Sequence, residues 1–219
     1  MNTNLLLSII GLAGGLICVL ADLLLDLKGK DNEKLGAKKF LDSNWVKMPA
    51  WRFSASIILA MFAVPMYSMG VISLGNHIAL QNEWLGDSLK LSIFIGAMGG
   101  FFIHAFACIT PILYKEIMKR DDFPLAESVI MRVYSAVIIP FGLLYLVLML
   151  VPTAIIMFTI LTGLLPVPVW FILLNPVVFQ IVGWILRAVN KKWFREAPSI
   201  FMASLGLAMF GVIGIVIHL

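Results

Sequence analysis

The strongest constraint in this sequence is a series of long apolar runs separated by short polar segments. An α-helix needs about 20 apolar residues to cross the hydrocarbon core of a bilayer. Runs of this length or longer cover residues 5–27, 53–74, 89–113, 129–189 and 200–219. Of the 219 residues, 61% are hydrophobic and 13% are charged, against about 45–50% and about 25% in soluble domains. The chain is therefore predicted to be an all-α, polytopic membrane helix bundle that forms a single transmembrane domain over residues 1–219.

The basic residues decide how often the long run at 129–189 crosses the membrane. Cytoplasmic loops of membrane proteins are enriched in Lys and Arg. If this run crosses twice, 15 of the 16 basic residues lie on one side, and only Lys90 lies on the other. If it crosses three times, the basic segment 187–195 moves to the opposite face. The sequence therefore predicts six transmembrane helices with both termini on the outer face (N-out/C-out).

The division of the run at 129–189 follows from its prolines and glycine. Proline removes a backbone donor and clashes with the preceding helical turn, and Gly163, Pro166 and Pro168 together predict a break. A break at Pro152 is the alternative. With the later break, the predicted spans cover about residues 5–27, 53–74, 89–113, 133–162, 168–189 and 199–219.

Two ionisable residues lie inside the predicted spans on faces rich in small residues. Asp22 shares a helix face with Gly11, Gly15 and Cys18, because these positions are three or four apart. His104 shares a face of the third span with Gly96, Gly100 and Cys108. Small residues let helices approach closely, and charged groups inside a membrane usually face protein or a water-filled cavity.

Both residues are expected in the cytoplasmic half of the bilayer, where they could share one pocket. The Asp22 carboxylate could then hold the imidazole proton of His104 and set its tautomer. Asp22 could instead pair with Arg132, and Asp26 could pair with Arg52. A purely structural role, in which Asp22 and His104 hydrogen-bond neighbouring helices, is the alternative for both.

Further polar residues complete the candidate site. Tyr67 lies deep in the second span, and Asn175 precedes Pro176 in the fifth. Asn175 could instead donate to the carbonyl group that Pro176 frees, and the arginines could serve only as positive-inside anchors. The candidate ligand-binding residues are Asp22, His104, Arg52, Arg132, Tyr67 and Asn175.

Motifs that would indicate a standard active site are missing from the sequence. It has no HExxH, no GxSxG, no phosphate-binding loop and no paired histidines at metal-ligand spacing. We therefore predict no metal site and no cofactor. No nucleic acid is expected as a partner, because membrane orientation accounts for the basic residues.

Several short motifs are similar to those of a bacterial family of small six-span membrane proteins known only as a domain of unknown function. The matching pieces are Gly14-Gly15 with Ala21-Asp22, Trp51-Arg52-Phe53-Ser54, Pro65-Met66-Tyr67 with Gly70, Gly99-Gly100 with His104-Ala105-Phe106, and Leu165-Pro166-Val167-Pro168-Val169-Trp170 with Asn175-Pro176. The resemblance implies six spans and no assigned activity. We expect the membrane to be a bacterial cytoplasmic membrane.

Three functions fit these observations. The first is binding or transport of a small or lipid-like ligand in a cavity within the membrane. The second is an intramembrane enzyme on a lipid or isoprenoid substrate, with His104 as acid or base and Asp22 orienting it. The third is a structural or accessory membrane subunit. We expect a multi-pass protein of the cell membrane whose partners are membrane lipids and, in the first two cases, the ligand.

Overall fold

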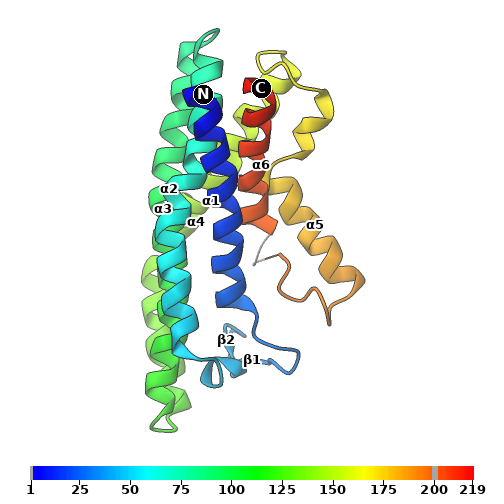
Figure 1. Ribbon diagram of the computed structural model, residues 1–219. Helices are drawn as coiled ribbons and strands as arrows, with labels where there is room; N and C mark the ends of the chain where they lie inside the picture. The colour runs from blue at the N-terminus through cyan, green and yellow to red at the C-terminus, as the bar shows by residue number, and fades with distance from the viewer. Residues whose placement is uncertain (1, 199–201) are drawn as a thin grey trace.

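The computed structural model describes residues 2–198 and 202–219, which fold into α-helices joined by short connections (Figure 1). Four helices are long and apolar enough to cross a membrane: α1 (Thr3–Asp26), α2 (Ala50–Ala79), α3 (Glu83–Met118) and α4 (Phe123–Leu161). Two shorter apolar helices follow, α5 (Pro176–Val189) and α6 (Met202–His218). The all-α prediction is confirmed. The beginning of the predicted sixth span, at 199–201, lies outside the described residues.

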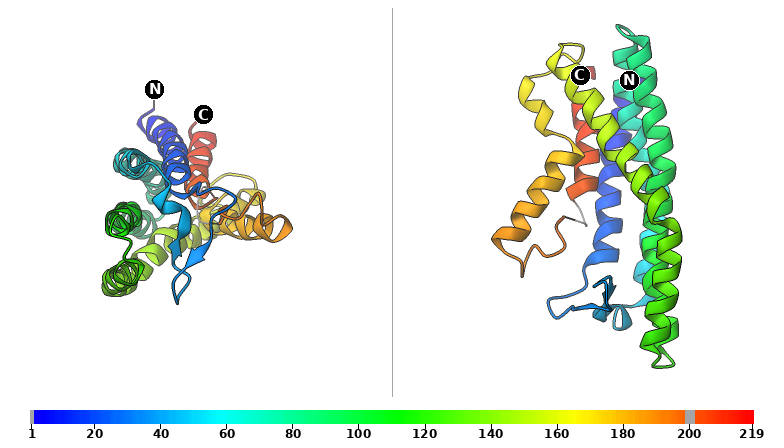
Figure 2. Two further views of the ribbon diagram at one scale, coloured as in Figure 1. Left: turned by 90° about the horizontal axis from the view of Figure 1, so that it is seen from below. Right: turned by 180° about the vertical axis from the view of Figure 1, so that it is seen from behind.

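The helices run alternately up and down, and both termini lie at the same end of the bundle (Figure 1). α1 lies between α2 and α6 and packs on both of them. α3 and α4 form a long hairpin beside α2, and its turn extends beyond the other helices (Figure 2). The basic connections 27–49, 119–122 and 190–198 all lie at the end opposite the termini.

The first basic connection contains a small hairpin and a short 3-10 helix. Strands β1 (Lys34–Leu35) and β2 (Leu41–Asp42) pair antiparallel, and the 3-10 helix η1 (Ser43–Val46) leads into α2. The turn between the strands uses Gly36 at φ 81°, a left-handed conformation that glycine adopts without steric cost.

A buried lysine ties this connection to the end of α1. Lys28 Nζ lies 2.7 Å from Asp26 Oδ1, 3.5 Å from Asp42 Oδ2 and 3.9 Å from Glu196 Oε2. Burial lowers the pKa of the Lys28 ammonium group, but the three carboxylates outweigh burial and raise this pKa above its usual value. Lys28 therefore stays charged, and it joins the ends of α1, β2 and the segment that follows α5.

α4 passes Pro140 and Pro152 without a break and ends at Leu161. Gly163, at φ 77°, turns the chain, and the Leu165 amide donates to the Thr159 carbonyl at 3.0 Å. Because the helix continues through Pro152, the break in the run at 129–189 lies after Leu161, at the later of the two positions considered.

The fifth segment is interrupted a second time, at Asn175–Pro176. A 3-10 helix, η2 (Val169–Leu173), precedes an extended residue at Asn175, and α5 begins at Pro176. The Asn175 side chain accepts from the Val178 amide at 3.0 Å and donates to the Ile172 carbonyl at 2.6 Å. An amide side chain thus replaces the backbone hydrogen bonds that the break removes, as any irregular backbone at membrane depth requires.

Glycines bring the backbones of α1, α2 and α6 into direct contact. A Cβ atom on Gly11 would lie 2.4 Å from the Gly70 Cα atom, and one on Gly70 would lie 3.1 Å from the Gly211 backbone nitrogen. One turn further along α1, a Cβ atom on Gly15 would lie 2.4 Å from the Ala208 Cβ atom of α6. Close approach of this kind is how helices associate where hydrophobic burial drives little association.

We expect Gly11→Ala to lower the free energy of unfolding by about 1–3 kcal/mol, because the new methyl group has no room between two backbones. Gly142→Ala is the matched control, since no atom lies within 4 Å of a Cβ at that helical position. It should leave stability unchanged or raise it by up to about 1 kcal/mol. Unfolding of both variants in detergent measures the difference, and equal stability of the two would contradict the close contact.

Candidate functional site

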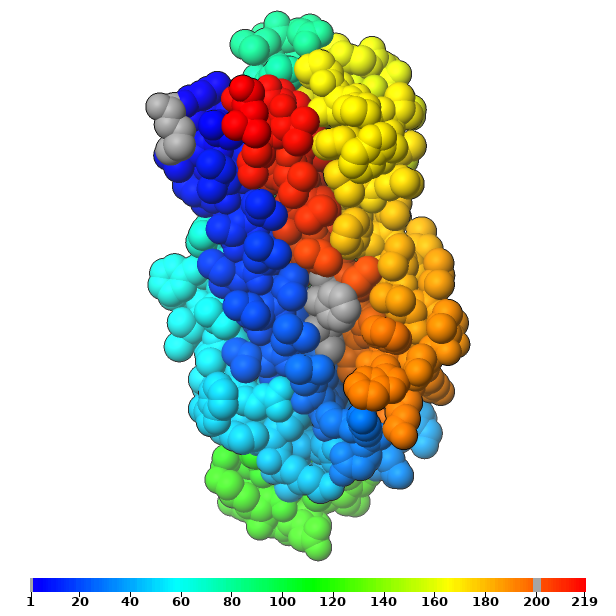
Figure 3. Space-filling model, turned by 45° about the vertical axis from the view of Figure 1, so that its right-hand side comes forward, coloured from blue at the N-terminus to red at the C-terminus, as the bar shows by residue number. Residues whose placement is uncertain are grey.

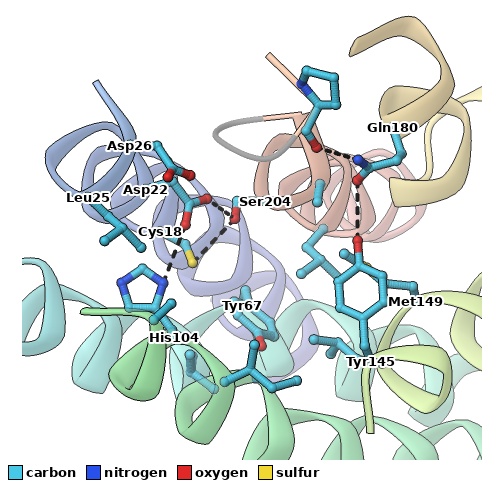
Figure 4. A pocket seen from close by; sticks show the side chains of 18 of the residues that line it. Cys18, Asp22, Leu25, Asp26, Tyr67, His104, Tyr145, Met149, Gln180 and Ser204 are labelled. Atoms are coloured by element: carbon cyan, nitrogen blue, oxygen red, sulfur yellow. Dashed lines mark hydrogen bonds and ion pairs between the residues drawn. The ribbon is translucent and has the colours of Figure 1, made fainter. Parts of the chain in front are cut away.

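A cavity of about 490 Å³ lies among the helices, and residues from α1 to α6 line it (Figure 4). Most of its wall is apolar, including Val64, Leu148, Met149 and Leu207. Two polar clusters interrupt this wall. The first joins α1, α3 and α6, and the second joins α4 and α5.

The first cluster is built around Asp22, which is 9% exposed. Its Oδ2 atom accepts a hydrogen bond from the Ser204 hydroxyl at 2.5 Å, and its Oδ1 atom lies 3.4 Å from His104 Nδ1. The Ser204 oxygen also lies 3.4 Å from Cys18 Sγ. Because the Ser204 hydrogen is used on the carboxylate, the contact with Cys18 is one in which the thiol donates.

Ser56 fixes the tautomer of His104 from the other side of the ring. The Ser56 hydroxyl donates its one hydrogen to the Ala21 carbonyl at 2.7 Å, and its oxygen lies 2.8 Å from His104 Nε2. The thiol of Cys108 donates to the same oxygen at 3.4 Å. With its hydrogen already used, Ser56 can only accept from the imidazole. His104 Nε2 therefore carries a proton.

A second proton lies between His104 and Asp22. An unprotonated Nδ1 atom facing an unprotonated carboxylate would place two lone pairs against each other in a buried site. The pair therefore exists either as imidazolium and carboxylate or as neutral imidazole and carboxylic acid. In both forms the two side chains together carry no net charge, so neither leaves an uncompensated charge buried among the helices.

The second cluster faces the first across the cavity. The Tyr145 hydroxyl donates to Gln180 Oε1 at 3.3 Å, and Gln180 Nε2 donates to the Pro198 carbonyl. This chain of bonds leaves the phenol oxygen free to accept another hydrogen bond. The Arg187 guanidinium carbon lies 5.2 Å from the centroid of the Trp184 ring, and Arg187 is the one lysine or arginine in the described lining.

The structure brings three of the candidate residues to the cavity. Asp22, His104 and Tyr67 line it together. A Cβ atom on Gly100 would lie 2.6 Å from the Tyr67 hydroxyl oxygen, so the glycine at that position leaves room for the phenol.

The other three candidates do not contribute to the lining of this cavity. Arg52 donates to the Leu23 and Leu27 carbonyls at the end of α1, at 3.3 and 3.0 Å. The expected Asp26–Arg52 pair is therefore wrong, because Asp26 pairs with Lys28. Arg132 is exposed, so its alternative pairing with Asp22 does not form either. Asn175 caps α5.

Sequence reasoning missed the two serines that complete the first cluster. Ser56 and Ser204 are buried, and each lies on a largely apolar helix. Their signal is weak, because a membrane serine usually bonds to its own helix. Only the depth match with Asp22 and His104 could have singled them out.

The described residues form no cluster of side chains that could coordinate a metal ion. Within residues 2–198 and 202–219, no three His, Cys, Asp or Glu side chains are grouped closely enough to hold an ion. Cys18 and Cys108 are free, buried thiols.

The fold and its apolar helices define this protein as a helical membrane protein. The chain belongs to the family described as "family of unknown function (DUF6796)", whose model matches residues 1–219. The resemblance to a domain-of-unknown-function family is thereby confirmed. Comparisons with curated proteins and with solved structures found no match.

The arrangement of His104 predicts a specific nuclear magnetic resonance signature. In protein labelled with ¹⁵N-histidine, the Nε2 atom of His104 should be protonated at every pH at which the protein is folded. Ser56→Ala removes its acceptor and should shift this signal, whereas Ser92→Ala, on the same helix as His104, should not. His104→Gln assigns the resonance, and an unprotonated Nε2 would contradict the hydrogen-bond assignment.

Proposed function

We propose that this protein binds a small or lipid-like ligand in the cavity between its helices and holds or transports it there. The observation that carries the proposal is an apolar cavity of about 490 Å³ with a polar cluster on each of two facing walls. Ligand sites typically measure about 300–1,000 Å³ and combine apolar walls with a few convergent polar groups. The ligand would have an apolar middle and hydrogen-bonding groups toward Asp22 and Tyr145.

An adjoining cavity supports access from the basic end. It measures about 300 Å³ and shares Leu25, Asp26, Ile103 and Ala107 with the first. Its lining reaches the charged connection that follows α1, including Lys34 and Lys39. Together the two cavities lead from the level of the charged loops to the Asp22–His104 pair.

Binding accounts for the imidazole better than acid–base catalysis does. A general acid or base must reach the proton that it transfers. Both ring nitrogens of His104 are engaged, one with Ser56 and the other with Asp22. An enzymatic role on a lipid or isoprenoid substrate would require one of these contacts to break first.

A purely structural role explains only the first cluster. Asp22, Ser204 and His104 do link three helices. That role gives no reason for the facing Tyr145–Gln180 pair or for the cavity between the two clusters.

Mass spectrometry of the purified protein tests the proposal. We expect a stoichiometric small molecule or lipid to copurify with the wild type and to be lost from Asp22→Asn. Asp87→Asn is the matched control, because Asp87 is exposed on α3 and pairs with Lys90 at 2.7 Å. It should retain the ligand.

Thermal unfolding separates loss of ligand from loss of structure. Asp22→Asn keeps the size of the side chain and can still accept from Ser204, so the empty variant should remain folded. Retention of the same ligand by Asp22→Asn, or a wild type that carries none, would contradict the proposed binding role.

The bundle would cross a cell membrane six times, with both termini outside, as in a bacterial cytoplasmic membrane. The common position of the three basic connections supports this orientation. The segments at α5 and α6 would then cross despite their short helices. α5 would do so with the help of η2.

Cysteine labelling in intact cells tests this topology. Gln81→Cys, in the exposed turn between α2 and α3, should react with a maleimide that cannot cross membranes. Lys38→Cys, in the first basic connection, should react only after the cells are permeabilised. The native Cys18 and Cys108 are buried and should contribute little background. The reverse pattern would overturn the orientation.

A further inference from the structure

A second cavity, of about 750 Å³, lies between the end of α1 and the segment that follows α5. It shares no lining residue with the cavity that contains Asp22 and His104. Figure 3 shows the segment after α5, in orange, beside the blue residues at the end of α1. Five basic side chains and one acidic side chain belong to its lining: Lys28, Lys30, Lys191, Lys192, Arg195 and Glu196.

The acidic side chain, Glu196, already forms ion pairs with two of the basic ones. Glu196 lies 3.9 Å from Lys28 Nζ and 3.8 Å from Arg195 Nε. Lys28 in turn lies closest to Asp26. These ion pairs balance most of the charge that Lys28, Arg195 and Glu196 bring to the lining.

Three other lysines at the same cavity have no carboxylate partner among the described residues. Within the described part of the chain, no carboxylate lies at ion-pair distance from Lys30, Lys191 or Lys192. Lys30 Nζ instead lies over the Trp193 ring, 4.2 Å from its centroid. Three unpaired cations around one hollow repel one another, and an anion placed between them would relieve that repulsion.

The surroundings of the cavity indicate the level of the lipid headgroups. Trp193 is 69% exposed, and Phe194 is 37% exposed. Exposed aromatic side chains collect at the membrane–water interface. Leu23 and Leu27 of the first apolar run contribute an apolar side to the same cavity.

We propose that this cavity binds the phosphate group of an anionic phospholipid, with Lys30, Lys191 and Lys192 as its ligands. The lipid tails would leave along the apolar side formed by Leu23 and Leu27. A cluster of basic side chains just beyond the cytoplasmic end of a membrane helix is the kind of site that takes such headgroups. The cavity that contains Asp22 plays no part in this site.

Native mass spectrometry can count the lipids that stay bound to the protein. After equilibration in mixed phosphatidylglycerol and phosphatidylcholine, the wild type should retain phosphatidylglycerol preferentially. The triple variant Lys30→Gln/Lys191→Gln/Lys192→Gln should bind it on the order of 100-fold more weakly, at roughly five-fold per lysine.

Lys38→Gln/Lys119→Gln/Arg120→Gln is the matched control. It removes the same number of charges from the same end of the bundle but leaves the cavity intact. It should retain phosphatidylglycerol like the wild type. Equal loss in both triple variants would reduce the effect to overall charge and overturn the site.

Inorganic phosphate distinguishes a lipid from a soluble ligand. Phosphate at millimolar concentration should not displace phosphatidylglycerol from the wild type, because it lacks the contacts with Leu23 and Leu27. Displacement by free phosphate, or equal retention of phosphatidylcholine, would overturn the assignment to an anionic lipid. Loss of the copurifying ligand in Asp22→Asn leaves these outcomes unaffected, so the two proposals fail separately.

Discussion

Gly11, Gly70 and Gly211 let the backbones of α1, α2 and α6 touch, and the positions of the buried polar groups follow from this contact. One turn or more along α1, Gly15 continues the approach to α6 at Ala208. Asp22 lies further along the same face, and it therefore meets Ser204 near the beginning of α6. A side chain at Gly15 or Gly211 would collide with the facing helix, move α6 outward and separate the carboxylate from the hydroxyl.

The polar groups of the resulting cluster hydrogen-bond to one another and to the neighbouring helices, and the cluster faces the cavity on one side. The Ser56 hydroxyl of α2 donates a hydrogen bond to the Ala21 carbonyl of α1 and accepts one from His104 Nε2 of α3. One hydroxyl group therefore connects three helices. Each hydrogen in the cluster has an acceptor, which is the condition under which buried polar networks stabilise a fold. A buried proton shared by Asp22 and His104 also makes the cluster neutral.

Local patterns in the sequence predict the membrane class and the helical fold. They also predict that Asp22 lies close to His104. Apolar length and the spacing of small residues are local properties, and they predicted these features. The predicted pairing of Asp26 with Arg52 was wrong because the partners of these residues depend on the path of the connection after α1. In that connection Lys28 lies near three carboxylates at once. Ser56 and Ser204 were missed because their role depends on which helices are neighbours, and spacing within one helix does not contain that information.

The cavity exists because α5 does not complete the bundle. The break at Asn175–Pro176 redirects the chain, and of the 14 residues in α5 only Pro176 and Gly183 are buried. α5 packs on α6, where Gly183 approaches Met202 and Pro198, but it contacts α4 only slightly. The bond between Tyr145 and Gln180 thus spans a gap that apolar packing leaves open. Because little buried apolar surface would be lost, separation of α5 from α4 costs less than separation of any pair among α1, α2 and α6. The side of the cavity between α4 and α5 is accordingly the one that can widen around a bulky ligand with the least disruption of the fold.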